Sequence, residues 1–535
     1  MMAFVQNFPF MSILLSLFSG PLCSVLDGKW ARRVNTAVIA VIGIMSAFVL
    51  KHVSAGQPYV YRMGHFSAPW GNEIRVGTLE AFMACFFCAV MLLCMLGGIR
   101  ERAAQIEEGK QNLYYVMVNL LLCSLLALIY TNDLFTAYVF VEINTISACG
   151  LIMIRQTGRT FEAATRYMIM SLLGSGLLLL GICHLYAVTG HLLMSNIKEQ
   201  VQVITATGRY HISLMVALGL MSVGLAIKSA LYPFHAWLPD AYGYSTLSSS
   251  AILSSLVSKG YIFLLIKIFY RVVGIQAVRE SKVVNVLFVF GIAGMIMGSL
   301  SAIKEENLKR MIAYSSVAQI GYIYMGLGLA TDAGAIASLY HVLSHAATKS
   351  LLFVAAAGLA QASGGSDRYG DITGAGFRNR LAGVAFTVGS LSMVGMPVFS
   401  GFISKLLFAR AAVGHAHKML PTVIALAVST ILNAVYFMKT VIRIYTIRPV
   451  EPGREGENPG SGGTGRQSRG GIGAVSAIEV AEAEILPKET GRTVRLLEEP
   501  AKAAALVCFI LLNLILGLNS DPIVRLIQGG IEMFE

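Results

Sequence analysis

Long, uninterrupted apolar runs recur from one end of the sequence to the other. A helix that crosses a bilayer needs about 20 consecutive apolar residues, and these runs reach that length. The chain of 535 residues is 56% hydrophobic and 13% charged, whereas a soluble domain carries about 25% charged residues. The pattern predicts an all-α polytopic membrane protein. It excludes a soluble multidomain enzyme, and it argues against an outer-membrane barrel, whose strands alternate apolar and polar residues.

About fourteen spans are predicted, an even number that places both termini on the same side of the membrane. Their predicted ranges are 7–26, 34–53, 78–99, 112–130, 131–155, 164–189, 212–234, 244–272, 284–304, 309–330, 334–360, 381–414, 420–444 and 501–528. Lysine and arginine are more frequent in the odd-numbered loops, as at Lys29, Arg32 and Arg33. Because cytoplasmic loops are enriched in these residues, we predict a bacterial-type plasma membrane protein with both termini outside.

The charge balance does not indicate a nucleic-acid partner, and the cysteines do not indicate a metal site. The formal charge is +12, but the basic residues lie mostly between apolar runs, so we expect them to face lipid headgroups rather than nucleic acid. Cys85 and Cys88 form a CxxC inside an apolar run, with no second pair or histidine set at zinc spacing. They predict helix packing, so no metal site and no cofactor is expected.

One long polar interruption separates the last predicted span from the others. Residues 449–500 contain a glycine-crowded stretch from Gly453 to Gly473, a composition typical of flexible linkers. The stretch has neither a preceding strand nor the Gly-Lys-Ser/Thr ending of a phosphate-binding loop. We predict a flexible cytoplasmic linker.

Ionisable residues inside the apolar runs are the most informative feature. Each costs on the order of 2.5–3.5 kcal/mol at mid-membrane on insertion scales. They are Glu142, Lys228, Lys259, His341, His345, Lys349 and Lys405. Taken singly, a lysine could extend to the interface and a histidine could bond a neighbouring helix. Taken together, one acid and several bases form the series that a proton or ion relay requires.

Prolines lie close to two of these lysines. Pro233 and Pro239 follow Lys228, and Pro397 precedes Lys405. Proline interrupts a helix interior, and non-helical backbone at membrane depth is tolerated only where it is buried in protein or lines a cavity. Interrupted helices in both halves of a chain are typical of transporters with inverted repeats.

Five segments carrying these residues resemble one family. The segments are AIKSALYPFHAWLPDAY (226–242), LVSKGYIFLL (256–265), KEENLKRMIAYSSVAQIGY (304–322), HVLSHAATKSLLFVAAAG (341–358) and GMPVFSGFISK (395–405). They are similar to the antiporter-like membrane subunits shared by respiratory complex I, Mrp-type Na⁺/H⁺ antiporters and membrane-bound group 4 hydrogenases. The resemblance covers roughly residues 78–445.

The resemblance implies fourteen helices with two inverted five-helix repeats, each containing a broken helix. The implied divisions are 1–111 for helices 1–3, 112–274 and 275–445 for the two repeats, 446–500 for the linker and 501–535 for the last helix. Glu142 matches the family's fifth-helix glutamate and Lys228 the lysine of the first broken helix. Lys259 matches the central lysine and Lys405 the terminal one, with His341, His345 and Lys349 on the helix between them.

Two departures from the family pattern stand out. At 245–250 this chain has SerThrLeuSerSerSer where the family usually has a proline-containing stretch. Some complex I members carry glutamate where Lys405 lies.

We therefore expect a proton-translocating subunit of a larger membrane complex, with no redox chemistry of its own. Its expected partners are other subunits, the lipid bilayer and H⁺, with Na⁺ as a second candidate ion. The parent complex could be a quinone reductase, a hydrogenase or an antiporter. The alternatives are a stand-alone secondary transporter of a small solute and a structural membrane subunit whose charges only direct helix packing.

Overall fold

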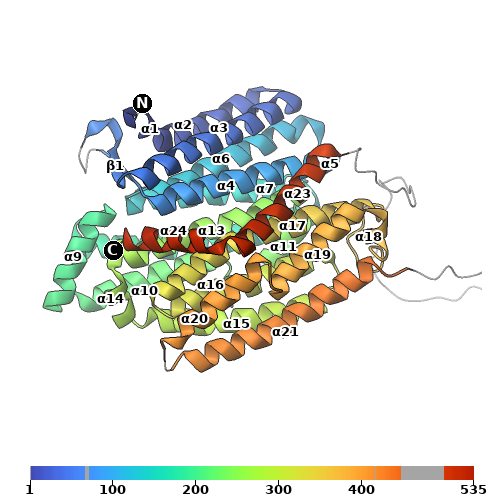
Figure 1. Ribbon diagram of the computed structural model, residues 1–535. Helices are drawn as coiled ribbons and strands as arrows, with labels where there is room; N and C mark the ends of the chain where they lie inside the picture. The colour runs from blue at the N-terminus through green and yellow to red at the C-terminus, as the bar shows by residue number, and fades with distance from the viewer. Residues whose placement is uncertain (1, 67–70, 416, 448–498, 535) are drawn as a thin grey trace, which may run out of the picture.

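The computed structural model describes residues 2–66, 71–415, 417–447 and 499–534. Most of them are helical, and the long helices lie side by side in one bundle (Figure 1). The protein is a multi-pass membrane protein of the predicted mainly helical class. The predicted linker at 449–500 lies almost wholly outside the described residues.

Twelve helices within the described ranges are long and apolar enough to cross a membrane. They are α2 (Phe8–Val25), α3 (Gly28–Ala55), α4 (Thr78–Gly97), α6 with its preceding turn (Glu108–Tyr130), α7 (Leu134–Met153), α8 (Gly158–Thr189), α10 (His211–Lys228), the continuous run from α12 to η4 (Leu247–Val273), α15 (Val283–Lys304), α17 (Asp332–Gln361), α21 (Met419–Ile444) and α23 (Pro500–Leu518). Each of these falls within one of the predicted spans or overlaps most of it.

Two further predicted spans correspond to helices that are not among these twelve. The span at 309–330 is α16 (Leu308–Gly328), whose first turn carries Lys309 and Arg310. The span at 381–414 is two shorter helices, α19 (Arg380–Val394) and α20 (Ser400–Val413). The count of fourteen and the division into two inverted repeats stay predictions.

Several elements were not predicted from the sequence. A hairpin pairs β1 (Tyr59–Arg62) with β2 (Glu73–Val76) in antiparallel register, so the fold is not purely helical. The remaining short helices are α1 (Met2–Val5), α5 (Ile99–Gln105), α9 (Met194–Thr207), α11 (Leu238–Tyr244), α14 (Ile275–Glu280), α18 (Ala375–Arg378) and α24 (Ser520–Glu532). They lie between the long helices or beyond them.

The predicted last span, 501–528, is two helices rather than one. Helix α23 ends at Leu518, and α24 begins at Ser520 and packs against α17 and α4. Pro522 explains the interruption, because its ring would clash with the carbonyl of Leu518 in a continuous helix. In Figure 1 the end of α24 lies at the same end of the bundle as α1.

An ion-pair cluster holds the start of α23 against the bundle. Glu499 accepts from Arg100 at 3.0 Å and from Gln361 at 2.8 Å. Lys502 pairs with Glu499 at 3.3 Å and also with Glu101. Partial burial alone would raise the pKa of Glu499, but Lys502 and the donated hydrogen bonds hold the pKa below its ordinary value. The cluster joins α23 to α5 and to the end of α17.

The middle of the bundle is formed by the run from α12 to η4 and by α17, which are buried along their whole apolar length. A helix apolar on every side normally lies in a protein interior or faces lipid. Both segments also carry buried lysine and serine side chains, and α17 carries two buried histidines. The candidate relay residues lie on these central helices, on the interrupted helices beside them and, for Glu142, on α7.

Candidate functional site

Lys228 is the last residue of α10. The chain then leaves the helix and resumes as α11. Pro233 lies inside this interruption, where its missing N–H breaks no helical hydrogen bond. Pro239 lies in the first turn of α11, a position that favours proline because first-turn N–H groups have no acceptor within the helix. The helix therefore ends directly at the lysine.

Helix α7 supplies the partners of Lys228. The Lys228 Nζ atom lies 3.7 Å from Glu142 Oε1 and donates a 2.6 Å hydrogen bond to Thr145 Oγ1. The Lys228 side chain is 0% exposed and that of Glu142 is 25% exposed. A buried ammonium needs partners of this kind. Because the acid and the hydroxyl lie one helical turn apart, both are within reach of the same ammonium group.

Lys259 lies near the start of α13 (Ser258–Lys267), directly after the π-helical turn η3 (Leu253–Val257). Its Nζ atom donates to the Ser254 carbonyl at 2.5 Å and to Ser258 Oγ at 3.2 Å. The residue is fully buried, and these partners are both uncharged. Single π-helical turns inside longer helices occur frequently at functional sites.

His341, His345 and Lys349 lie on one face of α17. His341 Nδ1 is 2.6 Å from Ser404 Oγ of α20. The His341 and His345 ring centroids are 6.0 Å apart. His345 is buried, and within the described ranges neither of its ring nitrogens has a hydrogen-bond partner. Lys349 donates to the Ile312 carbonyl at 2.8 Å and to Ser315 Oγ, both on α16.

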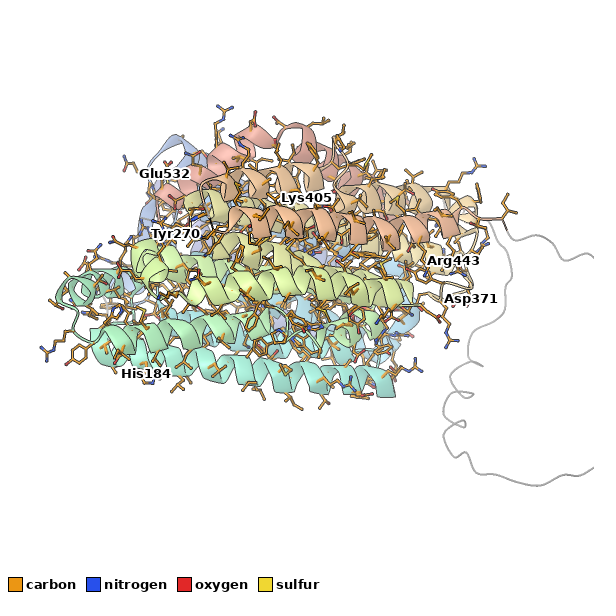
Figure 2. The ribbon with its side chains drawn as sticks, turned by 90° about the horizontal axis from the view of Figure 1, so that it is seen from below. His184, Tyr270, Asp371, Lys405, Arg443 and Glu532 are labelled. Atoms are coloured by element: carbon orange, nitrogen blue, oxygen red, sulfur yellow. The ribbon has the colours of Figure 1, made fainter. Side chains whose placement is uncertain are left out.

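Lys405 lies on α20, beyond a second interruption at 395–399 that contains Pro397. Its Nζ atom donates to the Val394 carbonyl at 2.6 Å and to Thr430 Oγ1 at 2.8 Å. Val394 ends α19, so the ammonium lies where the helix dipole favours a cation. In Figure 2 Lys405 lies between the end of the bundle marked by Tyr270 and Glu532 and the end marked by Asp371 and Arg443.

Gly395 makes this close approach possible. Its φ of 90° belongs to the left-handed region that glycine adopts without steric cost. A Cβ atom at this position would lie 2.9 Å from Lys405 Cδ. Both the turn and the lysine therefore require glycine here.

Hydroxyl groups fill the space between the charged residues. The structure pairs Ser254 with Ser316 at 3.1 Å and Ser255 with Ser350 at 2.6 Å. These serines and Thr145 were not predicted from the sequence. Only Ser254 and Ser255 had a signal, the serine-rich stretch from 245 onward, where Thr246 caps α12 (Leu247–Ile252) by accepting from the Ser249 N–H at 3.2 Å.

A second buried ionic cluster was also missed. Glu80 of α4 accepts a 2.5 Å hydrogen bond from Arg271 of η4 (Ile268–Val273), and both side chains are at most 2% exposed. Lys267 donates to the carbonyls of Ile129 at 3.0 Å and Thr131 at 2.5 Å, at the end of α6 (Gln111–Tyr130). These residues lie inside predicted apolar spans, so the transfer-cost argument could have found them.

The arrangement gathers titratable side chains from several helices inside the bundle. Within the described ranges no group of three His, Cys, Asp or Glu residues is placed to hold a metal ion. The seven candidate residues lie on five helices that contact one another in series. Helix α7 bonds to α10 through Thr145 and Lys228, α10 packs against α13, α13 against α17 and α17 against α20.

Comparison with known proteins finds the family that the sequence resembles. Residues 131–432 match the family described as NADH:quinone oxidoreductase/Mrp antiporter, transmembrane. An NADH-quinone oxidoreductase subunit N of Desulforudis audaxviator is 32% identical over 422 residues, which cover 78% of this chain and 82% of that protein. A putative antiporter subunit, mnhD2, of Staphylococcus aureus is 28% identical over 77% of this chain and 79% of that protein.

Solved structures share the fold over nearly the whole chain. A chain of the Mrp complex from a Dietzia species superposes with a TM-score of 0.82 at 25% identity, covering 99% of this chain and 97% of that one. A chain of an archaeal membrane-bound sulfane sulfur reductase gives a TM-score of 0.81 at 23% identity, covering 100% and 98%. With more than half of its length matched by the family and a relative above 30% identity, the chain belongs to the NADH:quinone oxidoreductase/Mrp antiporter transmembrane family.

Proposed function

We propose that this chain is a proton-translocating membrane subunit that moves protons along a buried relay. The path runs from Lys228, whose proton affinity Glu142 controls, through Lys259 and the α17 residues Lys349, His345 and His341 to Lys405. The observation that carries the proposal is the pair of buried Lys228, at the end of an interrupted helix, with partly exposed Glu142. A lysine in that position gains or loses proton affinity according to how close the carboxylate lies.

Membership of the family supports the inference that this chain has partner subunits. The relatives are named as subunits of an NADH-quinone oxidoreductase and of an antiporter, and the similar structures are multisubunit membrane complexes. We infer that this chain likewise works with other subunits and performs no redox step itself. The transported ion is H⁺, with Na⁺ as the second candidate. The two repeats would occupy 112–274 and 275–445.

The orientation in a bacterial-type plasma membrane is also a proposal. It rests on the excess of lysine and arginine in the odd-numbered loops, which places both termini outside the cytoplasm. Single cysteines introduced at Lys29 and at Arg209, in the first and sixth loops, should react oppositely with a membrane-impermeant thiol reagent in intact cells. Labelling is expected at 209 and not at 29. The reverse result would invert the orientation.

Glu142→Gln tests the function directly. The amide keeps the size of the side chain but cannot carry the charge that raises the proton affinity of Lys228. In membrane vesicles containing the assembled complex, the rate of ΔpH formation should fall by about tenfold or more, the change that one pKa unit of lost interaction represents.

The matched control is Glu162→Gln. Glu162 pairs with Arg166 at the surface of α8 and is 62% exposed, so its loss should leave ΔpH formation unchanged. Assembly of each variant is checked by immunoblotting. Normal pumping by an assembled Glu142→Gln complex would show that the proposed control of Lys228 is wrong.

A further inference from the structure

Helix α16 lies between the two interrupted regions and is buried over nearly its whole length. It packs against α15 with their backbones in contact. A Cβ atom added to Gly321 would lie 2.5 Å from the Gly291 carbonyl, and one added to Gly298 would lie 2.6 Å from the Ala318 nitrogen. Packing this close leaves no room for side chains to adjust. The helix pair therefore behaves as one stiff element.

One face of α16 contacts the first interruption beside Lys228. The Tyr324 hydroxyl is 2.7 Å from Ser229 Oγ, and both groups are buried. Ser229 also lies 2.8 Å from the Leu225 carbonyl, to which it can donate its single proton. Tyr324 is then the donor in the pair. Because Ser229 directly follows Lys228, a displacement of the Lys228 backbone moves the group that Tyr324 holds.

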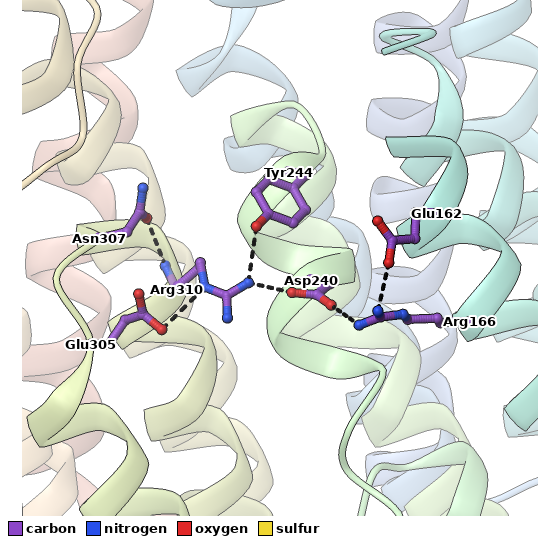
Figure 3. A network of polar contacts seen from close by, with 7 residues as sticks. All are labelled: Glu162, Arg166, Asp240, Tyr244, Glu305, Asn307 and Arg310. Atoms are coloured by element: carbon purple, nitrogen blue, oxygen red, sulfur yellow. Dashed lines mark hydrogen bonds and ion pairs between the residues drawn. The ribbon is translucent and has the colours of Figure 1, made fainter. Parts of the chain in front are cut away.

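The start of α16 contacts the far side of the same interruption. Figure 3 shows Arg310 of α16 reaching Asp240 of α11, which is also bonded to Arg166 of α8 at 2.7 Å. Lys309 donates to the Ser245 carbonyl at 2.9 Å, directly after α11. Helix α16 therefore holds both the helix that ends at Lys228 and the short helix that follows it.

The face of α16 toward α17 contacts the second part of the relay. Lys349 donates to the Ile312 carbonyl and to Ser315 Oγ. The Tyr322 ring stacks on His341, with centroids 5.4 Å apart and planes at 19°. The same stiff helix thus positions Lys349 and His341 while it contacts Ser229.

We propose that α16 couples the two parts of the relay, with Tyr324 and Ser315 as positioning residues. Movement of Lys228 between Glu142 and Thr145 shifts Ser229, Tyr324 passes that shift to α16, and α16 changes the position of the Lys349 ammonium. The inference rests on the proposed proton relay and adds how its halves communicate. Neither positioning residue exchanges a proton in this scheme.

A double-mutant cycle on α16 tests the coupling. Positions 315 and 324 are about 13 Å apart along the helix axis, a separation at which independent substitutions have additive effects. Tyr324→Phe removes the hydrogen bond to Ser229, and Ser315→Ala removes the bonds to Lys349 and to the Ile312 carbonyl. Each should slow ΔpH formation by about 2- to 10-fold. If α16 couples the sites, the double variant should be slowed markedly less than the product of the two single effects.

A second cycle identifies Ser229 as the group through which Tyr324 acts. Ser229→Ala, Tyr324→Phe and their combination should show the same rate and the same pH profile of pumping. That profile depends on Glu142, Lys228 and the neighbouring Tyr261, whose ring lies 5.6 Å from Lys228 Nζ. A purely structural loss would lower the amount of assembled complex without shifting the profile.

The control is Tyr130→Phe on α6. Tyr130 is buried, and its hydroxyl has no hydrogen-bond partner among the residues that the structure describes. It should pump normally, and its combination with Ser315→Ala should be additive. Additive effects of Tyr324→Phe and Ser315→Ala, or normal pumping by Tyr324→Phe, would overturn the coupling. The proposed relay would still stand after such a result if Glu142→Gln reduced pumping. The relay and the coupling through α16 can therefore be disproved separately.

Discussion

Lys228→Ala and Lys405→Ala should each abolish ΔpH formation in vesicles while the complex still assembles. In the proposed relay, alanine removes the amine that takes up and releases the proton at each interrupted helix. The acceptors Thr145, Val394 and Thr430 are neutral, and Glu142 is 25% exposed, so loss of a lysine leaves no fully buried charge unpaired and the complex should still assemble. The expected effect is complete loss of pumping, measured with a pH-sensitive dye and normalised to the amount of complex on immunoblots.

Arginine at the same positions separates proton transfer from packing. Arginine keeps the positive charge but does not release its proton in proteins. Lys228→Arg and Lys405→Arg should therefore assemble and fail to pump. If arginine restores pumping, the charges only direct packing and the protein is a structural subunit. Lys51→Ala, on the exposed face of α3, serves as the matched control and should pump normally.

Glu80→Gln should sharply reduce the amount of folded protein. Arg271 would remain buried without its acidic partner, although it lies 4.1 Å from the Phe534 ring. Breaking a buried ion pair from one side costs about 3–5 kcal/mol. We expect much less protein in the membrane and a lower unfolding temperature in detergent, followed by intrinsic fluorescence.

The double variant Glu80→Gln with Arg271→Gln is the informative comparison. It removes both charges, and the amide at 80 can still accept from the Gly77 N–H, as Glu80 Oε2 does at 3.1 Å. The amount of protein and the unfolding temperature should recover most of the way toward wild type. If the double variant were less stable than Glu80→Gln alone, the unpaired buried charge of Arg271 would not be the cause of the lost stability.

Apolar runs and prolines allowed much of the architecture to be predicted. Length and hydropathy located the long helices, because the transfer of an apolar segment into lipid depends on that segment alone. Pro233 and Pro397 located the two interruptions, because a proline in a helix interior lacks the N–H donor and clashes with the preceding turn. The division at Asn519 was missed, although Pro522 carried the same signal. The hairpin of β1 and β2 lies between the predicted spans 34–53 and 78–99 and was not predicted.

The candidate charges were also predicted from the sequence, since the cost of a lysine in an apolar run is visible without a structure. Their partners were not predicted. Thr145 beside Lys228 and Ser315 beside Lys349 are hydroxyl residues of ordinary kind. Only packing distinguishes them from the other serines and threonines.

What the sequence by itself determined is therefore local: which segments enter the membrane, where helices break and which buried groups can titrate. The tertiary structure decided which of these groups meet. Lys228 contacts a helix more than 80 residues earlier in the chain, as the 83-residue separation from Thr145 shows. Arg271 meets Glu80 across 191 residues. Such contacts depend on how whole helices pack, because the shape of each helix surface constrains its neighbours, and no short stretch of sequence contains that information.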